Sequence, residues 1–390
     1  FWTKRARSGL WIYFARGLMQ RNRLDLFNIG LIVANFVLGL VFPHTINSTW
    51  LLVSTAPLIW VLYRRSDNQF LGIVALLVGY SFLSIFWSYS PTAIHSFVPL
   101  LYALLVFLFA NSLGSRRLSV WLHHVLVLSA IIVSFVSIVM YFLGGEQRLS
   151  LLNLPINVSS GILAAVLVYL VVGLLIGRRL GPNWLHYIYV AVILLATILT
   201  YSRGAIILLL LFGLGYLFHW FVRLPNKHRP MLLLVLCGLL IAISLLATSN
   251  PIRYGYVRNT SVTTNDRREY VVAGIKSWWQ RPIFGSGIGS YAYVGLSEQT
   301  AVVVPSKNSH TAFITYLVEL GIVGSALWLI FLIKLGRVIR HRLTTNLLVA
   351  PFIYLLLHFY IDMDAAFLSA MIFLAIAGGH ASQTLAEKAD

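Results

Sequence analysis

A single histidine stands at the point where a polar segment of the sequence turns into a long apolar one. His310 follows "PSKNS" and precedes "TAFITYLVELGIVG". Because the reference pKa of histidine lies near ~6.5, a neutral imidazole here could act as a general base on a hydroxyl. His310 could instead hydrogen-bond the loop backbone or orient a phosphate. Spacing alone favours these simpler roles.

Three arginines could bind an anion. Arg203 lies in "TYSRGA", a very short turn between apolar segments, where it could be functional or could reach lipid headgroups. Arg267 and Arg268 begin the stretch "RREYVVAGIKSWWQRP". The planar guanidinium suits phosphate through charge-assisted hydrogen bonds. The alternative for this pair is ordinary pairing with Asp266, Glu269 or lipid headgroups.

The composition indicates a membrane protein. Of 390 residues, 59% are hydrophobic and 10% are charged, whereas roughly 25% of a soluble domain is charged. The net charge of +18 would suit nucleic acid, but the basic residues form short clusters between apolar runs. We therefore expect no nucleic acid partner. The single Cys237 allows no intrachain disulfide and no thiol-based metal site.

Twelve apolar segments are able to span a bilayer, which takes roughly 20 mostly apolar residues. We therefore predict an all-α polytopic membrane protein with about 12 transmembrane helices. The segments centre on residues 27–43, 48–63, 70–88, 94–113, 118–143, 155–176, 184–200, 205–222, 230–248, 311–333, 346–361 and 364–379.

Lysine and arginine clusters set the predicted orientation. They fall in the loops that are cytoplasmic when both termini are cytoplasmic, and the short outer loops hold only Arg148 and Arg203. The basic amino-terminal arm lacks a small-residue cleavage site, so we expect no cleavable signal peptide. The predicted organisation is a cytoplasmic arm, nine spans, a long periplasmic loop, three spans and a cytoplasmic tail, at residues 1–26, 27–248, 249–310, 311–379 and 380–390.

We predict a helix within the long loop. Asn265 or Asp266 could cap its start, and Pro282 would end it. Arg267 and Arg268 flank an apolar stripe, so an anion is expected opposite them. The two tryptophans of the stripe suit interfacial anchoring or stacking on sugar rings. The stripe consists of Val271, Ile275, Trp278 and Trp279.

Other polar and glycine-rich features favour structural roles. The stretch "FGSGIGSY" at 284–291 lacks the lysine of a phosphate-binding loop, so we expect a flexible turn that returns the chain to the membrane. Glu319 lies about half a turn around the helix from His310, which favours interhelical hydrogen bonding. His358 and Asp362 favour an interhelical pair over a metal site. The glycines of "GIVG" suit close helix packing.

Three motifs in order give the chain a resemblance to a known family. "YSRGA", "DRREYVVAGIKSWWQRPIFGSGIGSY" and "SHTAFITYLVELGIVG" resemble those of the O-antigen ligase and polymerase superfamily, and "FWSYSPTAI" resembles an early outer-loop feature of it. The ligase motif is His, then Asn, Ser or Gln, nine residues and Gly-x-x-Gly. Here His310 precedes Gly321 and Gly324 at that spacing, while Thr311 departs from the usual residue.

The resemblance implies a GT-C-like glycosyltransferase of the bacterial inner membrane. Its donor would be O-antigen on undecaprenyl diphosphate and its acceptor the lipid A core, joined at the periplasmic face by inverting transfer without a metal or other cofactor. Arg203 with Arg267 or Arg268 would hold the diphosphate. His310 would remove the acceptor proton.

Two other functions stay open at this point. The chain could be an O-antigen polymerase or a protein O-oligosaccharyltransferase of the same superfamily, which differ mainly in acceptor. The spacing from His310 to Gly324 and the compact chain without a large carboxy-terminal domain lead us to expect a ligase. A lipid-linked sugar flippase should spread charges along a path through its spans, whereas here they gather in the outer segments.

Overall fold

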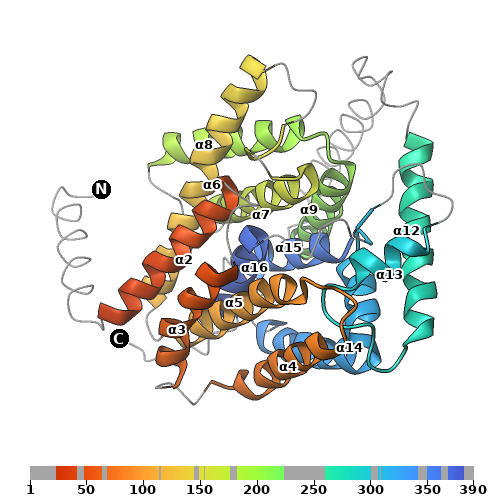
Figure 1. Ribbon diagram of the computed structural model, residues 1–390. Helices are drawn as coiled ribbons and strands as arrows, with labels where there is room; N and C mark the ends of the chain where they lie inside the picture. The colour runs from red at the N-terminus through yellow and green to blue at the C-terminus, as the bar shows by residue number, and fades with distance from the viewer. Residues whose placement is uncertain are drawn as a thin grey trace.

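The computed structural model describes most of the helical parts of the chain. The described ranges are 23–41, 48–63, 68–113, 116–144, 149–152, 154–175, 182–223, 260–299, 306–307, 309–340, 349–361 and 368–381. Every regular element within these ranges is a helix (Figure 1). The helices are α2 (Arg23–Val41), α3 (Ser48–Tyr63), α4 (Leu71–Leu83), η1 (Ser84–Trp87), α5 (Ala93–Ser112), α6 (Arg116–Gly144), α7 (Ile156–Leu175), α8 (Asn183–Leu199), α9 (Arg203–Arg223), α12 (Thr260–Gln280), α13 (Tyr291–Ser297), α14 (Ala312–Ile339), α15 (Val349–Ile361) and α16 (Leu368–Ala381).

The helices fit a polytopic membrane protein. Five of those described are long and apolar enough to cross a bilayer, namely Leu24–Val41, Ala93–Ser112, His124–Gly144, Ile156–Leu174 and Ala312–Ile339. Shorter apolar helices occupy most of the other predicted spans, and the predicted span 230–248 lies outside the described residues. The total of about 12 spans stays a prediction.

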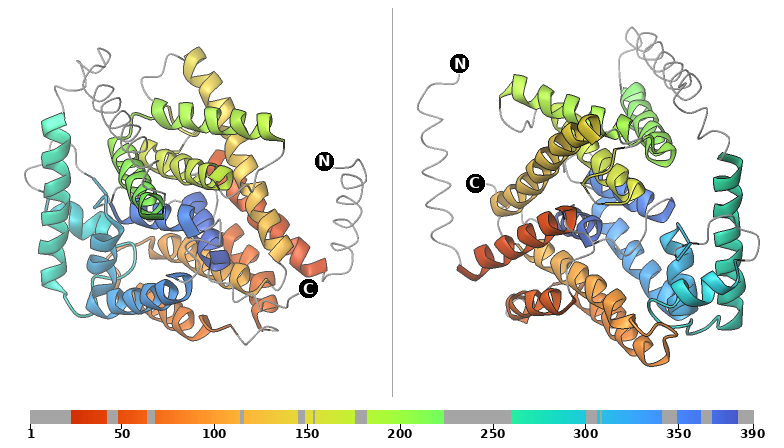
Figure 2. Two further views of the ribbon diagram at one scale, coloured as in Figure 1. Left: turned by 180° about the vertical axis from the view of Figure 1, so that it is seen from behind. Right: turned by 45° about the horizontal axis from the view of Figure 1, so that its top comes forward.

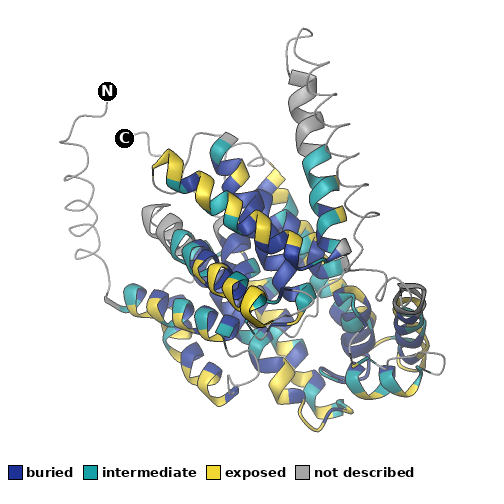
Figure 3. Ribbon diagram, turned by 90° about the horizontal axis from the view of Figure 1, so that it is seen from above, coloured by how far each residue is buried: buried dark blue, intermediate teal, exposed yellow. Residues whose placement is uncertain are grey.

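Burial separates central helices from peripheral ones. Helices α5 and α7 are apolar on all sides and mostly buried, as expected for helices enclosed by others. Helix α16 packs against α5 in the centre of the bundle. Peripheral helices such as α6 carry exposed apolar side chains, including Phe135 and Phe142 (Figure 3). Such a surface suits contact with lipid.

Two helices lie in the segment predicted as a long loop. Helix α12 stands along one edge of the molecule, next to α13 and the start of α14 (Figure 2). Pro282 follows its end as predicted, but the helix begins at Thr260 and not at Asn265 or Asp266. Polar residues such as Thr and Asn cost only a few tenths of a kcal/mol each within a helix, so a potential cap need not end one.

Helix α14 is interrupted at Gly321, whose φ of 63° and ψ of −165° are not helical. The interruption leaves backbone groups without helical partners, and the turn that follows α12 supplies new ones. The N–H groups of Ser286 and Gly287 donate to the carbonyls of Val318 and Glu319, each over 2.8 Å. The turn is therefore joined to α14 by backbone hydrogen bonds.

Backbone hydrogen bonds also join the turn to the residues of α14 that follow Gly321. The N–H of Ile322 donates to the carbonyl of Pro282 over 2.9 Å, and that of Val323 donates to Ile283 over 3.2 Å. We predicted close helix packing for both glycines of "GIVG". Gly324 does pack closely against Tyr80 of α4, whereas Gly321 serves instead to break the helix where the turn docks.

Candidate functional site

His310 lies in a tight turn directly before α14. Its φ of 58° is left-handed, which is uncommon for a residue other than glycine. Thr311 is the N-cap of α14, and its Oγ1 accepts a hydrogen bond of 3.2 Å from the N–H of Ile314. Ser309 Oγ donates to the carbonyl of Thr311 over 2.6 Å. Thr311 thus provides the capping oxygen that Asn or Ser would provide.

Tyr270 of α12 holds the imidazole of His310 from one side. Their ring centroids are 5.3 Å apart and their planes differ by 28°. Tyr270 is itself buried, and its carbonyl accepts a hydrogen bond of 2.8 Å from the hydroxyl of Tyr291. Sequence reasoning missed Tyr270, although it follows Arg267 by three residues and so shares a helix face with it. Ser306 Oγ lies 3.4 Å from Nε2 of His310.

The charge of Arg267 reaches His310. Burial and then the positive charge of Arg267 lower the pKa of His310 from 6.5 to about 4. The imidazole is therefore neutral at neutral pH and can accept a proton. Arg267 and Arg268 are both exposed, but only Arg267 is among the causes of this shift. The structure thus brings two of the predicted site residues, His310 and Arg267, together.

The partners of α12 keep this arrangement in place. Gly274 of α12 faces Ile314 of α14 so closely that a Cβ there would overlap the Ile314 side chain. Val271 and Trp278 pack on a buried cluster that includes Ile314, and Trp278 Nε1 donates to the carbonyl of Pro282 over 3.1 Å. The rest of the predicted stripe is exposed, with Ile275 at 44% and Trp279 at 73%.

The segments "FWSYSPTAI" and "FGSGIGSY" lie against each other. Ser88 Oγ donates to the carbonyl of Ile288 over 2.8 Å, and Ser84 Oγ accepts from its N–H over 3.2 Å. The guanidinium carbon of Arg281 lies 4.5 Å from the ring centroid of Tyr89. The segment "FWSYSPTAI" therefore supports the turn "FGSGIGSY". The turn was predicted, but hydrogen bonds to α14 and to this segment hold it in place where a flexible turn was expected.

Glu319 also supports this region. Its side chain is buried, and Oε1 accepts a hydrogen bond of 3.2 Å from the N–H of Tyr291 at the start of α13. A hydrogen bond to another helix was predicted for Glu319, and its partner is the backbone N–H of the first residue of α13. Glu319 thus fixes α13 beside α14 and is placed to position the site.

Arg203 occupies the first position of α9, and its side chain lies outside the described part. Ser202, directly before it, is buried. Two residues further on, the carbonyl of Ala205 accepts a hydrogen bond of 3.1 Å from the hydroxyl of Tyr354 on α15. The start of α9 is therefore held beside α15. Whether the Arg203 guanidinium joins the site stays a prediction.

His358 lies on α15, one helical turn after Tyr354. Their ring centroids are 6.0 Å apart. Arg267 interacts electrostatically with His358 as well as with His310. The interhelical pair predicted with Asp362 falls outside the described residues.

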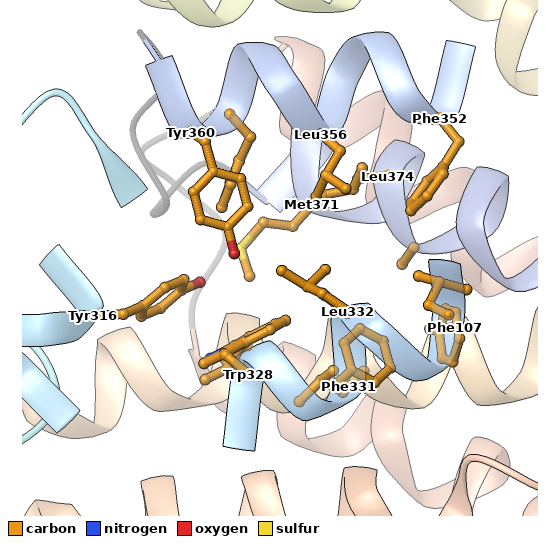
Figure 4. Close-up of a pocket in the computed structure, with 16 residues that line it drawn as sticks. Phe107, Tyr316, Trp328, Phe331, Leu332, Phe352, Leu356, Tyr360, Met371 and Leu374 are labelled. Atoms are coloured by element: carbon orange, nitrogen blue, oxygen red, sulfur yellow. The ribbon is translucent and has the colours of Figure 1, made fainter. Parts of the chain in front are cut away.

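An apolar cavity of about 60 Å³ lies between α5, α14, α15 and α16 (Figure 4). Tyr316 and Tyr360 line it, and their hydroxyls point into it at the same end. Tyr316 stacks on Trp328 with ring centroids 5.2 Å apart and an interplanar angle of 20°. The other lining side chains are almost all aliphatic or aromatic, as in Phe331 and Met371. Such a cavity suits hydrocarbon better than sugar.

The comparison with known protein families bears on the segment that contains most of this site. Residues 188–329 match the family model described as O-antigen ligase. Over this segment, which is about a third of the chain, the protein is similar to the O-antigen ligase family. No curated protein matched the sequence. The part with O-antigen ligase similarity runs from α8 through Arg203, α12 and His310 to about two thirds of the way along α14. The supporting serines of η1 and His358 of α15 lie outside it.

Proposed function

We propose that this protein is an O-antigen ligase. It would transfer O-antigen polysaccharide from undecaprenyl diphosphate to the lipid A core oligosaccharide at the periplasmic face of the bacterial inner membrane. The observation that carries the proposal is the charge of Arg267 acting on the partly buried imidazole of His310. A fixed cation beside a neutral base suits a reaction that releases a diphosphate and deprotonates a hydroxyl.

In the proposed reaction, a hydroxyl of the lipid A core attacks the anomeric carbon of the first O-antigen sugar. A new C–O bond forms on one face of this carbon while the bond to the diphosphate breaks on the other face, which inverts the configuration. The hydroxyl proton passes to His310, and the electron pair of the broken bond stays with the diphosphate. Arg267 and Arg203 would stabilise that anion.

The low pKa of His310 fits this sequence of events. Before the donor binds, burial and the charge of Arg267 keep the imidazole neutral. A diphosphate next to Arg267 would offset this positive charge and so raise the pKa of His310 towards the operating pH. His310 would then be a stronger base with the donor in place than without it.

A lipid-linked donor suits the predicted compartment. Outside the cytoplasm there is no pool of nucleotide sugars, so the sugar chain must arrive already activated. The resemblance also implies that guanidinium groups provide the positive charge that a divalent cation provides in many transferases that use diphosphates. We therefore expect transfer to continue when divalent cations are chelated.

The test is reconstitution in proteoliposomes with undecaprenyl diphosphate-linked O-antigen and rough lipopolysaccharide, with a chelator present. The wild type should form a lipopolysaccharide ladder, and Arg203→Ala, Arg267→Ala and His310→Ala should lose it. Lys276→Ala is the matched control, because Lys276 is an exposed basic residue further along α12. It should keep the activity of the wild type.

Three outcomes would contradict the proposal. O-units that lengthen on the lipid carrier would identify a polymerase, and transfer to a protein would identify an oligosaccharyltransferase. Translocation of the lipid without a new glycosidic bond would identify a flippase.

A further inference from the structure

His358 is a buried polar side chain without a hydrogen-bond partner in the described part of the protein. It is 1% exposed, and neither Nδ1 nor Nε2 has a partner there. Buried polar groups in proteins are nearly always hydrogen-bonded, so each exception calls for a physical explanation. His186 shows the usual situation, since it is equally buried and its Nε2 lies 3.0 Å from the carbonyl of Leu170.

The neighbouring contacts locate His358 near the start of α9. The hydrogen bond from Tyr354 to Ala205 places one face of α15 against the first turn of α9. His358 follows Tyr354 by four residues and therefore lies on the same face, about 6 Å further along the axis. In the predicted topology, α9 begins and α15 ends on the periplasmic side. His358 therefore lies at about the level of the amino-terminal end of α9.

The same imidazole lies within the electrostatic reach of the proposed active site. Arg267 of α12 acts on His310 before α14 and on His358 of α15. Helix α15 packs against both α9 and α14 (Figures 1 and 2). The charge of Arg267 thus acts on a histidine before α14 and on a histidine of α15.

We propose that His358 binds the donor by donating a hydrogen bond from its imidazole N–H to a phosphate oxygen of the diphosphate. The proposal rests on the proposed function, because it concerns the same lipid-linked donor. A phosphate oxygen accepts from a neutral imidazole, is favoured beside Arg267, and is favoured at the amino-terminal end of a helix such as α9. The ligand would supply the partner that the ring nitrogens lack in the described structure.

This assignment separates His358 from His310. His310 would receive the proton of the acceptor, whereas His358 would contact only the leaving group. Loss of His358 should therefore weaken donor binding, and loss of His310 should slow the chemical step.

The experiment measures binding of sugar-free undecaprenyl diphosphate to the full chain in nanodiscs, together with the melting temperature. His358→Phe should bind roughly tenfold or more weakly, because a hydrogen bond to a charged group is lost. His358→Gln keeps an N–H donor and should retain most of the affinity. The melting temperature of His358→Phe should not fall, because the imidazole nitrogens have no hydrogen-bond partner to lose in the described part of the protein and Phe keeps an aromatic ring beside Tyr354.

His186→Phe is the control for a structural histidine. It removes a ring that does have a partner, so it should lower the melting temperature and leave the affinity of the folded protein unchanged. If His358→Phe behaves like His186→Phe, or binds undecaprenyl diphosphate as tightly as the wild type, the inference is wrong.

Asp362→Asn tests whether His358 pairs with the carboxylate of Asp362. A melting temperature lowered equally by Asp362→Asn and His358→Phe would assign His358 to an interhelical pair and overturn the inference.

Two further arms identify the source of the phosphate. Phosphatidylglycerol added to the nanodiscs should not displace undecaprenyl diphosphate, and displacement at comparable concentrations would overturn the assignment to the donor. The ladder assay separates the two proposals. Donor binding that depends on His358 in a protein that makes no ladder would sustain the inference and contradict the ligase function. A ladder that is unaffected by His358→Phe would support the ligase function and contradict the role of His358. A wild type that binds no undecaprenyl diphosphate would contradict both proposals.

Discussion

The ring of Tyr270 lies against the imidazole of His310, with 5.3 Å between centroids and 28° between planes. The contact joins α12 to the turn before α14. It fixes the orientation of a ring whose backbone is in the left-handed region.

This contact predicts the effect of substituting Tyr270. Tyr270→Phe keeps the ring and should retain much more activity than Tyr270→Ala, which should lose roughly tenfold, because an aromatic pair is worth about 0.5–1.5 kcal/mol and orientation matters in addition. The loss should appear in kcat, measured from initial rates of ladder formation. Equal rates for the two variants would show that the ring does not position His310.

The pKa of His310 predicts the pH dependence of activity. Because the proposed base is neutral above about pH 4 in the free enzyme, kcat/KM should stay level on the acid side well below pH 6.5. Arg267→Gln removes a charge that lowers this pKa, so the remaining activity should decline at a higher pH than in the wild type. The imidazole resonances of His310 in nanodiscs would give both pKa values directly. A wild-type pKa near 6.5 would contradict the described burial.

The same pKa predicts a contribution to stability. His310 in the unfolded chain binds a proton below about pH 6.5, whereas the folded protein resists protonation until about pH 4. The unfolded state therefore binds more protons between these values, and stability should fall as the pH decreases through this window. His310→Gln should show a smaller decrease in melting temperature between pH 7 and pH 5 than the wild type.

The cap of α14 explains why Thr311 is accepted at a position where the resembling ligases have Asn, Ser or Gln. Thr311→Ser and Thr311→Asn should leave stability nearly unchanged, since both supply an oxygen for the N–H of Ile314. Thr311→Ala should lose about 1 kcal/mol and lower activity through the adjoining His310. Unfolding in denaturant and the ladder assay would measure the two effects.

The two glycines at the break in α14 should tolerate no side chain. A Cβ on Gly285 would lie 2.5 Å from the carbonyl oxygen of Glu319, and both Gly285 and Gly321 have positive φ. Gly285→Ala and Gly321→Ala should each cost more than about 1–2 kcal/mol, because the opposing atoms belong to the backbone and cannot move aside. Gly336→Ala, with open space around it on the same helix, should stabilise slightly. Melting temperatures would rank the three.

The apolar runs predicted most of the described apolar helices, because runs of this length have few alternatives. The order of the motifs also predicted that His310 and Arg267 are site residues. The sequence could not predict the role of Gly321, since a Gly-x-x-Gly pattern suits both close packing and a helix break. The choice depends on the turn at 282–287, which is distant in sequence. Tyr270 and His358 were assigned no part in the proposed site for a related reason: their importance comes from what faces them in space.

The break in α14 also constrains how this region can change during evolution. Residues 282–287 and 318–323 share their backbone hydrogen bonds, so neither stretch can gain or lose a residue without disrupting the other. Insertions and new acceptor specificities should therefore arise elsewhere, before α12 or between α13 and His310. Variation among relatives should leave the two joined stretches constant in length.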